Sequence, residues 1–147
     1  MDEALIKNWN DVVTRKDTTY IIGDFAWRDH AKYFNSLNGK KILVKGNHDK
    51  MPQVVYDNFT RIYTGIADIK IDKQKITLCH FPMYSWNCSV HGAWHLHGHT
   101  HNSPFKHPGL AINVGVDMWD YKPVSWKVIK DQLEKFALTH KPDDHHH

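Results

Sequence analysis

Hydrophobic residues recur along the chain with two different periods, one typical of helices and one of strands. The two patterns alternate along the chain, which predicts a mixed α/β protein. Leu5, Trp9 and Val12 are spaced three or four residues apart, which places their side chains on one face of a helix. β-Branched runs such as residues 18–22 instead have the composition of buried strands. On these criteria helices are expected over residues 2–15, 30–37, 52–58 and 124–136, and strands over residues 18–22, 42–44, 66–71, 75–78, 94–97 and 111–116.

The order of these elements predicts how they connect. A strand, a helix and a strand follow one another over residues 18–44, which indicates a crossover between parallel strands. The runs 66–71 and 75–78 flank Asp72-Lys73-Gln74 and are expected to form a hairpin. The 147-residue chain shows no internal repeat and no linker. A single domain is therefore expected over residues 1–140, with a tail or tag remnant over residues 141–147.

Composition and charge narrow the function classes without selecting one. Hydrophobic residues make up 41% of the chain and aromatic residues 12%, which is typical of a folded domain. The formal net charge of +3 is compatible with an anionic substrate but too small to indicate nucleic-acid binding alone. Cys79 and Cys88 do not form a C-x-x-C pair, so we expect two reduced thiols in a cytoplasmic protein. No apolar run is long enough to span a membrane, and the N-terminus does not resemble a signal peptide.

Four short segments carry side chains that bind metal ions, and each follows an apolar or β-branched run. They are Gly23-Asp24, Gly46-Asn47-His48-Asp49, Cys79-His80 and Gly98-His99-Thr100-His101. Strand ends hold ligands rigidly, while the loops that follow open them to substrate. One carboxylate, one amide oxygen and three imidazoles suit a divalent transition ion such as Mn, Fe, Zn, Co or Ni. Each segment alone is more typical of a turn, a cap or a hydrogen-bonded histidine, so the hypothesis depends on all four together.

The order of these segments resembles the calcineurin-like metallophosphoesterase family, in particular its small bacterial and phage members. In that family G-D, G-N-H-[DE], a solitary His and G-H-x-H all lie at strand ends, and residues 113–117 also fit the resemblance. The resemblance implies an α/β fold, a calcineurin-like sandwich of two mixed β-sheets flanked by helices. It also implies metal-dependent hydrolysis of a phosphomonoester or phosphodiester at a two-metal site, with metal-activated water as nucleophile and Mn as the favoured ion. The substrate would be a phosphate-ester small molecule or a nucleotide.

Carried over to this chain, the resemblance gives each residue a role. Asp24 would bridge the two metals, Asn47, His80 and His99 would complete one metal shell, and His101 would belong to the other. His48, held by Asp49, would be the catalytic histidine beside the leaving oxygen. Asn47 and His48 would also contact the substrate phosphate. Arg28 follows the first segment and is a further candidate for a phosphate contact, although a solvated loop charge is an equal alternative.

The family's first motif, D-x-H at the end of its first strand, is absent from this sequence, and so is that strand. One metal has a full set of protein ligands, but the other has only Asp24 and His101. We therefore expect the second metal to bind weakly and the activity to be much lower than in full-length relatives. Three explanations are open: a fragment or wrongly assigned start, which we favour; a complete chain that binds one ion tightly; or a partner subunit that supplies or covers the missing strand.

Two other functions fit parts of the pattern. A metal-binding scaffold of the same fold without turnover would explain the missing D-x-H motif, whereas the intact Asn47-His48-Asp49 speaks against it. A nuclease would need a basic groove. The lysines that would line it are too few to support that function: Lys40, Lys41, Lys45 and Lys50.

Several other histidines and aromatic residues have open roles. His95 and His97 share the strand parity of His99, so one of them is a candidate to support a metal ligand or to contact substrate. His91 and His107 fit surface or hydrogen-bonded positions better. Five aromatic side chains would either stack on a nucleobase or pack in the core: Tyr84, Trp86, Trp94, Trp119 and Tyr121.

Overall fold

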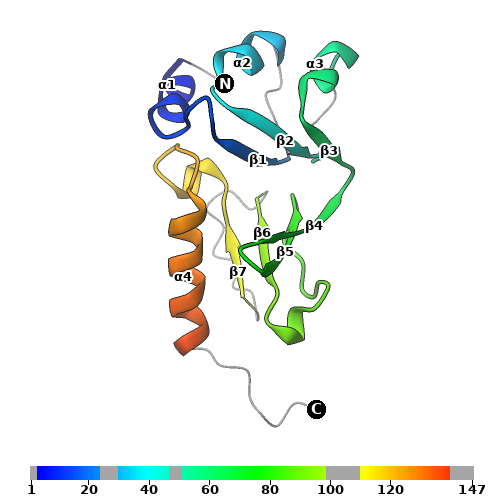
Figure 1. Ribbon diagram of the computed structural model, residues 1–147, viewed down its shortest axis with the longest axis vertical. Coiled ribbons are helices and arrows are strands. Elements are labelled where there is room, and N and C mark those ends of the chain that lie inside the picture. Colours follow the sequence, from blue (N-terminus) through cyan, green and yellow to red (C-terminus); the bar gives the residue numbers. More distant parts are fainter. Residues whose placement is uncertain (1–2, 24–29, 47–50, 99–109, 140–147) are drawn as a thin grey trace.

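The computed structural model describes residues 3–23, 30–46, 51–98 and 110–139, and these form helices and two β-sheets (Figure 1). The helices are α1 (Glu3–Val12), α2 (His30–Ser36), α3 (Gln53–Asn58) and α4 (Trp126–Thr139), with short 3-10 helices η1 (Ser89–His91) and η2 (Val116–Met118). The strands are β1 (Thr18–Ile22), β2 (Lys40–Val44), β3 (Arg61–Tyr63), β4 (Ile66–Ile71), β5 (Gln74–Cys79), β6 (Trp94–His97) and β7 (Ala111–Asn113). The mixed α/β class predicted from the two hydrophobic periods is confirmed.

The first sheet has the order β1-β2-β3, and its described strands are parallel. β1 pairs with β2 over its whole length, from Thr18 opposite Lys40 to Ile22 opposite Val44. The parallel crossover predicted over residues 18–44 is confirmed, because α2 connects these two strands. The sequence pattern does not predict β3, since three residues are too few to show an alternation. In the described part of the chain β1 pairs with β2 alone, so its other edge is where a further strand would pair.

The second sheet has the order β4-β5-β6-β7 and is mixed, so the expectation of mixed sheets holds for this sheet but not for the described strands of the first. β4 and β5 form the predicted antiparallel hairpin, while β5, β6 and β7 are parallel. The hairpin turn is one residue shorter than expected. Asp72 and Lys73 both adopt left-handed φ angles, 50° and 69°, and Gln74 already pairs with Ile71.

Side-chain hydrogen bonds explain why two elements differ from their predicted bounds. The Asn113 side-chain oxygen accepts a hydrogen bond from the Gly115 N–H at 2.8 Å, which turns the chain out of the sheet and ends β7 before residue 116. The Ser125 hydroxyl accepts a hydrogen bond from the Val128 N–H at 3.3 Å. This side-chain cap places the start of α4 at Trp126 rather than at residue 124.

Successive residues of β2 pack on opposite faces of the first sheet, which is therefore the middle layer of the molecule (Figure 1). Leu43 belongs to a cluster with the helices: Trp9, Val13, Leu37, Leu43, Val55 and Phe59. Val44 belongs to a second cluster with the other sheet and α4: Val44, Ala67, Ile76, Leu78, Trp94, Leu96, Ile129 and Leu133. Apolar burial on both faces of the first sheet therefore joins helices, first sheet and second sheet into one stack.

Lys41 is buried within β2 rather than exposed to solvent. Its ammonium group donates hydrogen bonds to the carbonyl oxygens of Leu37 at 2.7 Å and Gly39 at 3.1 Å, and it lies 4.4 Å from the centroid of the Phe34 ring. Burial lowers the pKa of Lys41. One of the four lysines considered for a nucleic-acid groove is therefore committed to holding the chain between α2 and β2.

None of the described helices combines the length and the apolarity needed to cross a bilayer. The longest of them, α4, has 14 residues. Cys79 is buried, Cys88 is partly buried, and both are free thiols.

We expect Leu43→Ala to lower the free energy of unfolding by about 2–5 kcal/mol, because this side chain is 0% exposed between the helices and the first sheet. Urea denaturation followed by circular dichroism measures the change. Leu138→Ala, at a residue of α4 that is 72% exposed, is the matched control and should change stability by less than about 0.5 kcal/mol. Equal losses in the two variants would contradict the layer assignment.

Candidate functional site

The predicted ligand segments begin where described parallel strands end. Gly23 follows β1, His80 follows β5 and Gly98 follows β6. The carboxyl ends of parallel strands meet at one edge of a sheet, which is where α/β proteins bind ligands. His80 is described, whereas the other predicted site residues lie outside the described residues: Asp24, Arg28, Asn47, His48, Asp49, His99 and His101.

His80 is the point at which the ends of the two sheets meet. Its side chain is only 3% exposed, and the Nδ1 atom lies 3.1 Å from the carbonyl oxygen of Ile22, the last residue of β1. The Gly98 N–H donates a hydrogen bond to the His80 carbonyl oxygen at 3.0 Å. The ends of β1, β5 and β6 are therefore tied together through one histidine.

Two glycines lie against the His80 ring because they have no side chain. A Cβ atom added to Gly23 would lie 2.3 Å from His80 Nδ1, and the φ of Gly23 is +79°. A Cβ added to Gly98 would lie 3.6 Å from the same nitrogen, which is an ordinary contact. The glycine that precedes Asp24 and the glycine that precedes His99 thus both pack against His80. In the sequence these glycines stand out only as parts of motifs, although a glycine directly before a predicted ligand is a signal of such close approach.

The environment of His80 suits a metal-binding imidazole. A carbonyl oxygen only accepts hydrogen bonds, so the contact with Ile22 requires the proton on Nδ1. A metal-binding histidine commonly donates its other ring N–H in this way. The Phe81 ring packs edge-on against the His80 ring, with centroids 5.0 Å apart and planes at 76°. Both contacts restrict rotation of the imidazole.

The end of β2 lies at the same sheet edge. The Lys45 N–H donates a hydrogen bond to the carbonyl of Tyr63, the last residue of β3, at 3.0 Å. The Lys45 ammonium lies 4.8 Å from the centroid of the Tyr56 ring. Gly46, which precedes the Asn47-His48-Asp49 segment, therefore leaves the sheet beside the ends of its parallel neighbours.

His95 has a structural role, which its strand parity did not reveal. The side chain is 0% exposed, its Nδ1–H donates to the Thr77 carbonyl at 3.0 Å, and its Nε2 accepts a hydrogen bond from the Met83 N–H at 3.0 Å. A ring whose two nitrogens are both used in this way is neutral and fixed in one tautomer. Such burial rules out contact with substrate in this conformation. His95 instead holds the segment that follows His80.

His97 is also buried, and its ring lies 5.2 Å from the ring of His95. Burial lowers the pKa of His97, and the hydrogen bond with the Gly98 carbonyl (3.2 Å) offsets this only in part. His91 is exposed, as expected, and His107 lies outside the described residues.

Three of the five aromatic side chains considered for base stacking have packing roles instead. Trp86 and Trp94 are buried, and the Trp86 indole N–H donates to the Ala93 carbonyl at 2.9 Å. The Trp119 indole N–H donates to the Asn113 carbonyl at 2.8 Å. Tyr84 and Tyr121 remain exposed.

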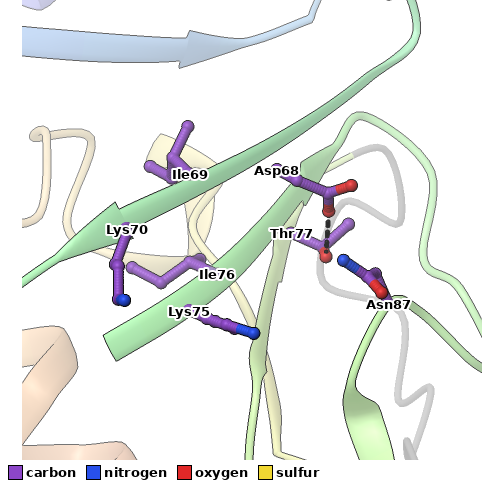
Figure 2. A pocket seen from close by; sticks show the side chains of 7 residues that line it. All are labelled: Asp68, Ile69, Lys70, Lys75, Ile76, Thr77 and Asn87. Atoms are coloured by element: carbon purple, nitrogen blue, oxygen red, sulfur yellow. Dashed lines mark hydrogen bonds between the residues drawn. The ribbon is translucent and has the colours of Figure 1, made fainter. Parts of the chain in front are cut away.

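A hollow of about 230 Å³ lies beside β4 and β5, away from the strand ends (Figure 2). Its lining residues are Asp68, Ile69, Lys70, Lys75, Ile76, Thr77 and Asn87. Asp68 is the one carboxylate that lines the hollow, and it already accepts a hydrogen bond from the Thr77 hydroxyl at 2.7 Å. Among the described residues no group of three His, Cys, Asp or Glu side chains lies close enough to hold a metal ion, and His80 is the one predicted ligand in that part of the chain.

No family model matches this chain. It is 36% identical to an uncharacterized protein, MJ1445, of Methanocaldococcus jannaschii, over 98% of this chain and 81% of that protein. It is 28% identical to the gene 66 protein of Mycobacterium phage D29, over 80% of this chain and 76% of the phage protein. The crystal structure of AQ665, a protein of unknown function from Aquifex aeolicus, superimposes with a TM-score of 0.70 at 27% identity, over 88% of this chain and 83% of that one.

Alanine substitutions of three glycines test whether His80 is fixed by the absence of a side chain at Gly23. Gly65 is the matched control, because its φ is +85° but no atom lies within 4 Å of an added Cβ. Gly65→Ala should cost only the backbone strain, about 1–2 kcal/mol of unfolding free energy. Gly23→Ala should cost a further 1–3 kcal/mol or so, because the new methyl group displaces the His80 ring. Gly98→Ala should preserve the position of His80. Chemical denaturation gives the energies, and the His80 ring signals in NMR report its displacement; equal costs for Gly23→Ala and Gly65→Ala would refute the contact.

Proposed function

The chain belongs to the same family as the uncharacterized protein MJ1445 of Methanocaldococcus jannaschii, and on this premise we propose that it is a metal-dependent hydrolase of phosphate esters. The names of its relatives specify no reaction, so the proposal depends on the residues of this chain. A single observation carries it: the positions directly before Asp24 and His99 both pack against the buried ring of His80.

This convergence supports a shared metal centre because covalent geometry limits how far the next residue can lie. Gly23 and Gly98 lie against His80, and consecutive Cα atoms are about 3.8 Å apart. The backbone therefore limits the distance from His80 at which Asp24 and His99 can start. Carboxylate and imidazole donors suit divalent transition ions, and we propose Mn as the native metal, with Fe, Zn, Ni or Co as alternatives. Asp24, Asn47, His80 and His99 would hold the first ion, and Asp24 and His101 the second.

The remaining residues have separate tasks in this proposal. A bound divalent cation would polarise the phosphoryl oxygens and lower the pKa of a bound water. His48 would hold a proton at the leaving oxygen, and Asp49 would fix the orientation of the His48 ring. Arg28 would pair with a non-bridging phosphate oxygen through its planar guanidinium group.

The arrangement of layers supports the finer fold assignment. We propose that the stack of helices, first sheet and second sheet is a calcineurin-like sandwich with its metal centre at the shared edge of strand ends. The packing of both faces of β2 and the link from β1 to His80 support this assignment.

A metal-binding scaffold without turnover is the second candidate, because Asp24 and His101 are the only residues of this chain assigned to the second metal. A nuclease is less well supported, because Lys41 is buried and hydrogen-bonded to two backbone carbonyls.

Turnover is tested with bis-p-nitrophenyl phosphate in the presence of Mn. We expect Mn-dependent release of p-nitrophenolate, with kcat/KM lowered about 100-fold or more in both His48→Ala and His80→Ala. His91→Ala removes an exposed histidine with no proposed role and should leave the rate unchanged. Mn-dependent binding without turnover would favour the scaffold, and full activity in His80→Ala would refute the proposed centre.

Metal stoichiometry is tested by titrating the metal-free protein with Mn in a calorimeter. We expect one tight site and a second at least about tenfold weaker, because the second ion has fewer protein ligands. His80→Ala should abolish the tight step, while His101→Ala should affect the weak one. Two equally tight steps would contradict this assignment of ligands.

A further inference from the structure

The segment between His80 and β6 presents two aromatic side chains to solvent. Phe81 is 43% exposed and Tyr84 is 81% exposed, although both rings are large and apolar. Trp86 in the same segment is buried and accounts for the packing of this segment onto the second sheet. Phe81 and Tyr84 are called the aromatic ledge below.

The aromatic ledge stands on fixed backbone. The Met83 N–H donates to the buried Nε2 of His95, which fixes the chain between Phe81 and Tyr84. Beyond Tyr84, the indole N–H of Trp86 donates to the Ala93 carbonyl at 2.9 Å. Because anchors flank Tyr84 on both sides, its exposure is a feature of the packed conformation.

The ledge begins at the proposed metal centre itself. The Phe81 ring contacts the imidazole of His80 at a centroid distance of 5.0 Å and still leaves 43% of Phe81 exposed. A phosphate ester held by a cation on His80 would therefore bring its ester group next to Phe81. Tyr84 lies three residues further along the same anchored segment.

We propose that the aromatic ledge binds the planar aromatic group of the substrate, so that the preferred substrates are phosphate esters of nucleosides or of aryl alcohols. Stacking on an aromatic side chain needs no particular hydrogen-bonding pattern, and a ring next to the phosphate gains affinity by leaving water. The inference rests on the proposed phosphoesterase function and adds a substrate class to it. Of the aromatic side chains first considered for stacking, Trp86 and Trp94 are excluded by their burial.

The test measures the affinity of the Mn-loaded protein for three phosphate compounds by calorimetry. AMP carries a nucleobase, phenyl phosphate carries an aryl ring, and ribose 5-phosphate carries no aromatic group. We expect at least one of the two aromatic compounds to bind about five- to tenfold more tightly than ribose 5-phosphate. Preference for AMP alone identifies nucleotides as the substrate class, and preference for phenyl phosphate identifies aryl esters.

Variants separate stacking from support of His80. Tyr84→Ala should remove the preference for aromatic compounds while retaining the affinity for ribose 5-phosphate, and Tyr84→Phe should keep the preference because it keeps the ring. Phe81→Ala also removes a contact with His80, so it should weaken all three compounds but the two aromatic ones more than ribose 5-phosphate. Val90→Ala, at a residue 83% exposed in the same segment, is the matched control and should change nothing. Equal weakening of all three compounds in Phe81→Ala would show that Phe81 only positions His80 and would overturn the inference.

The outcomes also separate this inference from the proposed function. Mn-dependent turnover and binding without any aromatic preference would overturn the aromatic ledge alone. If none of the three compounds binds and no ester is hydrolysed, the proposed function fails, and the ledge fails with it.

Discussion

The contact between the His80 ring and the end of β1 is the constraint on which the candidate site depends. A histidine that is 3% exposed contacts the Ile22 carbonyl and packs against the unsubstituted Cα of Gly23 at the end of β1, although it follows β5 of the other sheet. The contact does two things together: it joins the strand ends of the two sheets, and it directs the Nδ1 proton to a backbone carbonyl, as is common in metal-binding histidines. A larger residue at position 23 would displace either the His80 ring or the end of β1, because its Cβ would occupy the space of the imidazole.

The rest of the fold places this contact. Leu43 packs toward the helices and Val44 toward the second sheet, so the first sheet is fixed from both faces. This packing sets the position of its strand ends relative to the second sheet. β5 and β6 run parallel to each other and end directly before His80 and Gly98. His95 then holds the chain that leaves His80, because its buried ring accepts a hydrogen bond from the Met83 N–H. Burial in the core and order at the strand ends are thus parts of one arrangement.

The elements with several turns or a clear alternation were predictable from the sequence. β1, β4 and β6 have the predicted bounds, because β1 is rich in β-branched residues, β4 and β6 alternate apolar and polar residues, and a turn-type residue follows each strand. β3 was not predictable, since three residues pair with β2 through the backbone and leave no pattern. The end of β7 depends on a side-chain hydrogen bond of Asn113, which periodicity does not reveal.

For the site, the sequence indicated His80 and the strand ends, but not what surrounds them. Parity placed His95 with His99, while the roles of its two nitrogens depend on Thr77 and Met83, which precede it by 18 and 12 residues. The close approach of Gly23 likewise depends on a residue 57 positions away. Such non-local contacts decide whether a histidine binds a metal or supports a loop.

Anomalous diffraction from crystals of the protein grown with Mn would locate the metal relative to His80. We expect the strongest Mn peak within coordination distance of His80 Nε2 and the Asp24 carboxylate, with Nδ1 still hydrogen-bonded to the Ile22 carbonyl. A Mn peak elsewhere, with Asp24 distant from His80, would refute the proposed metal centre.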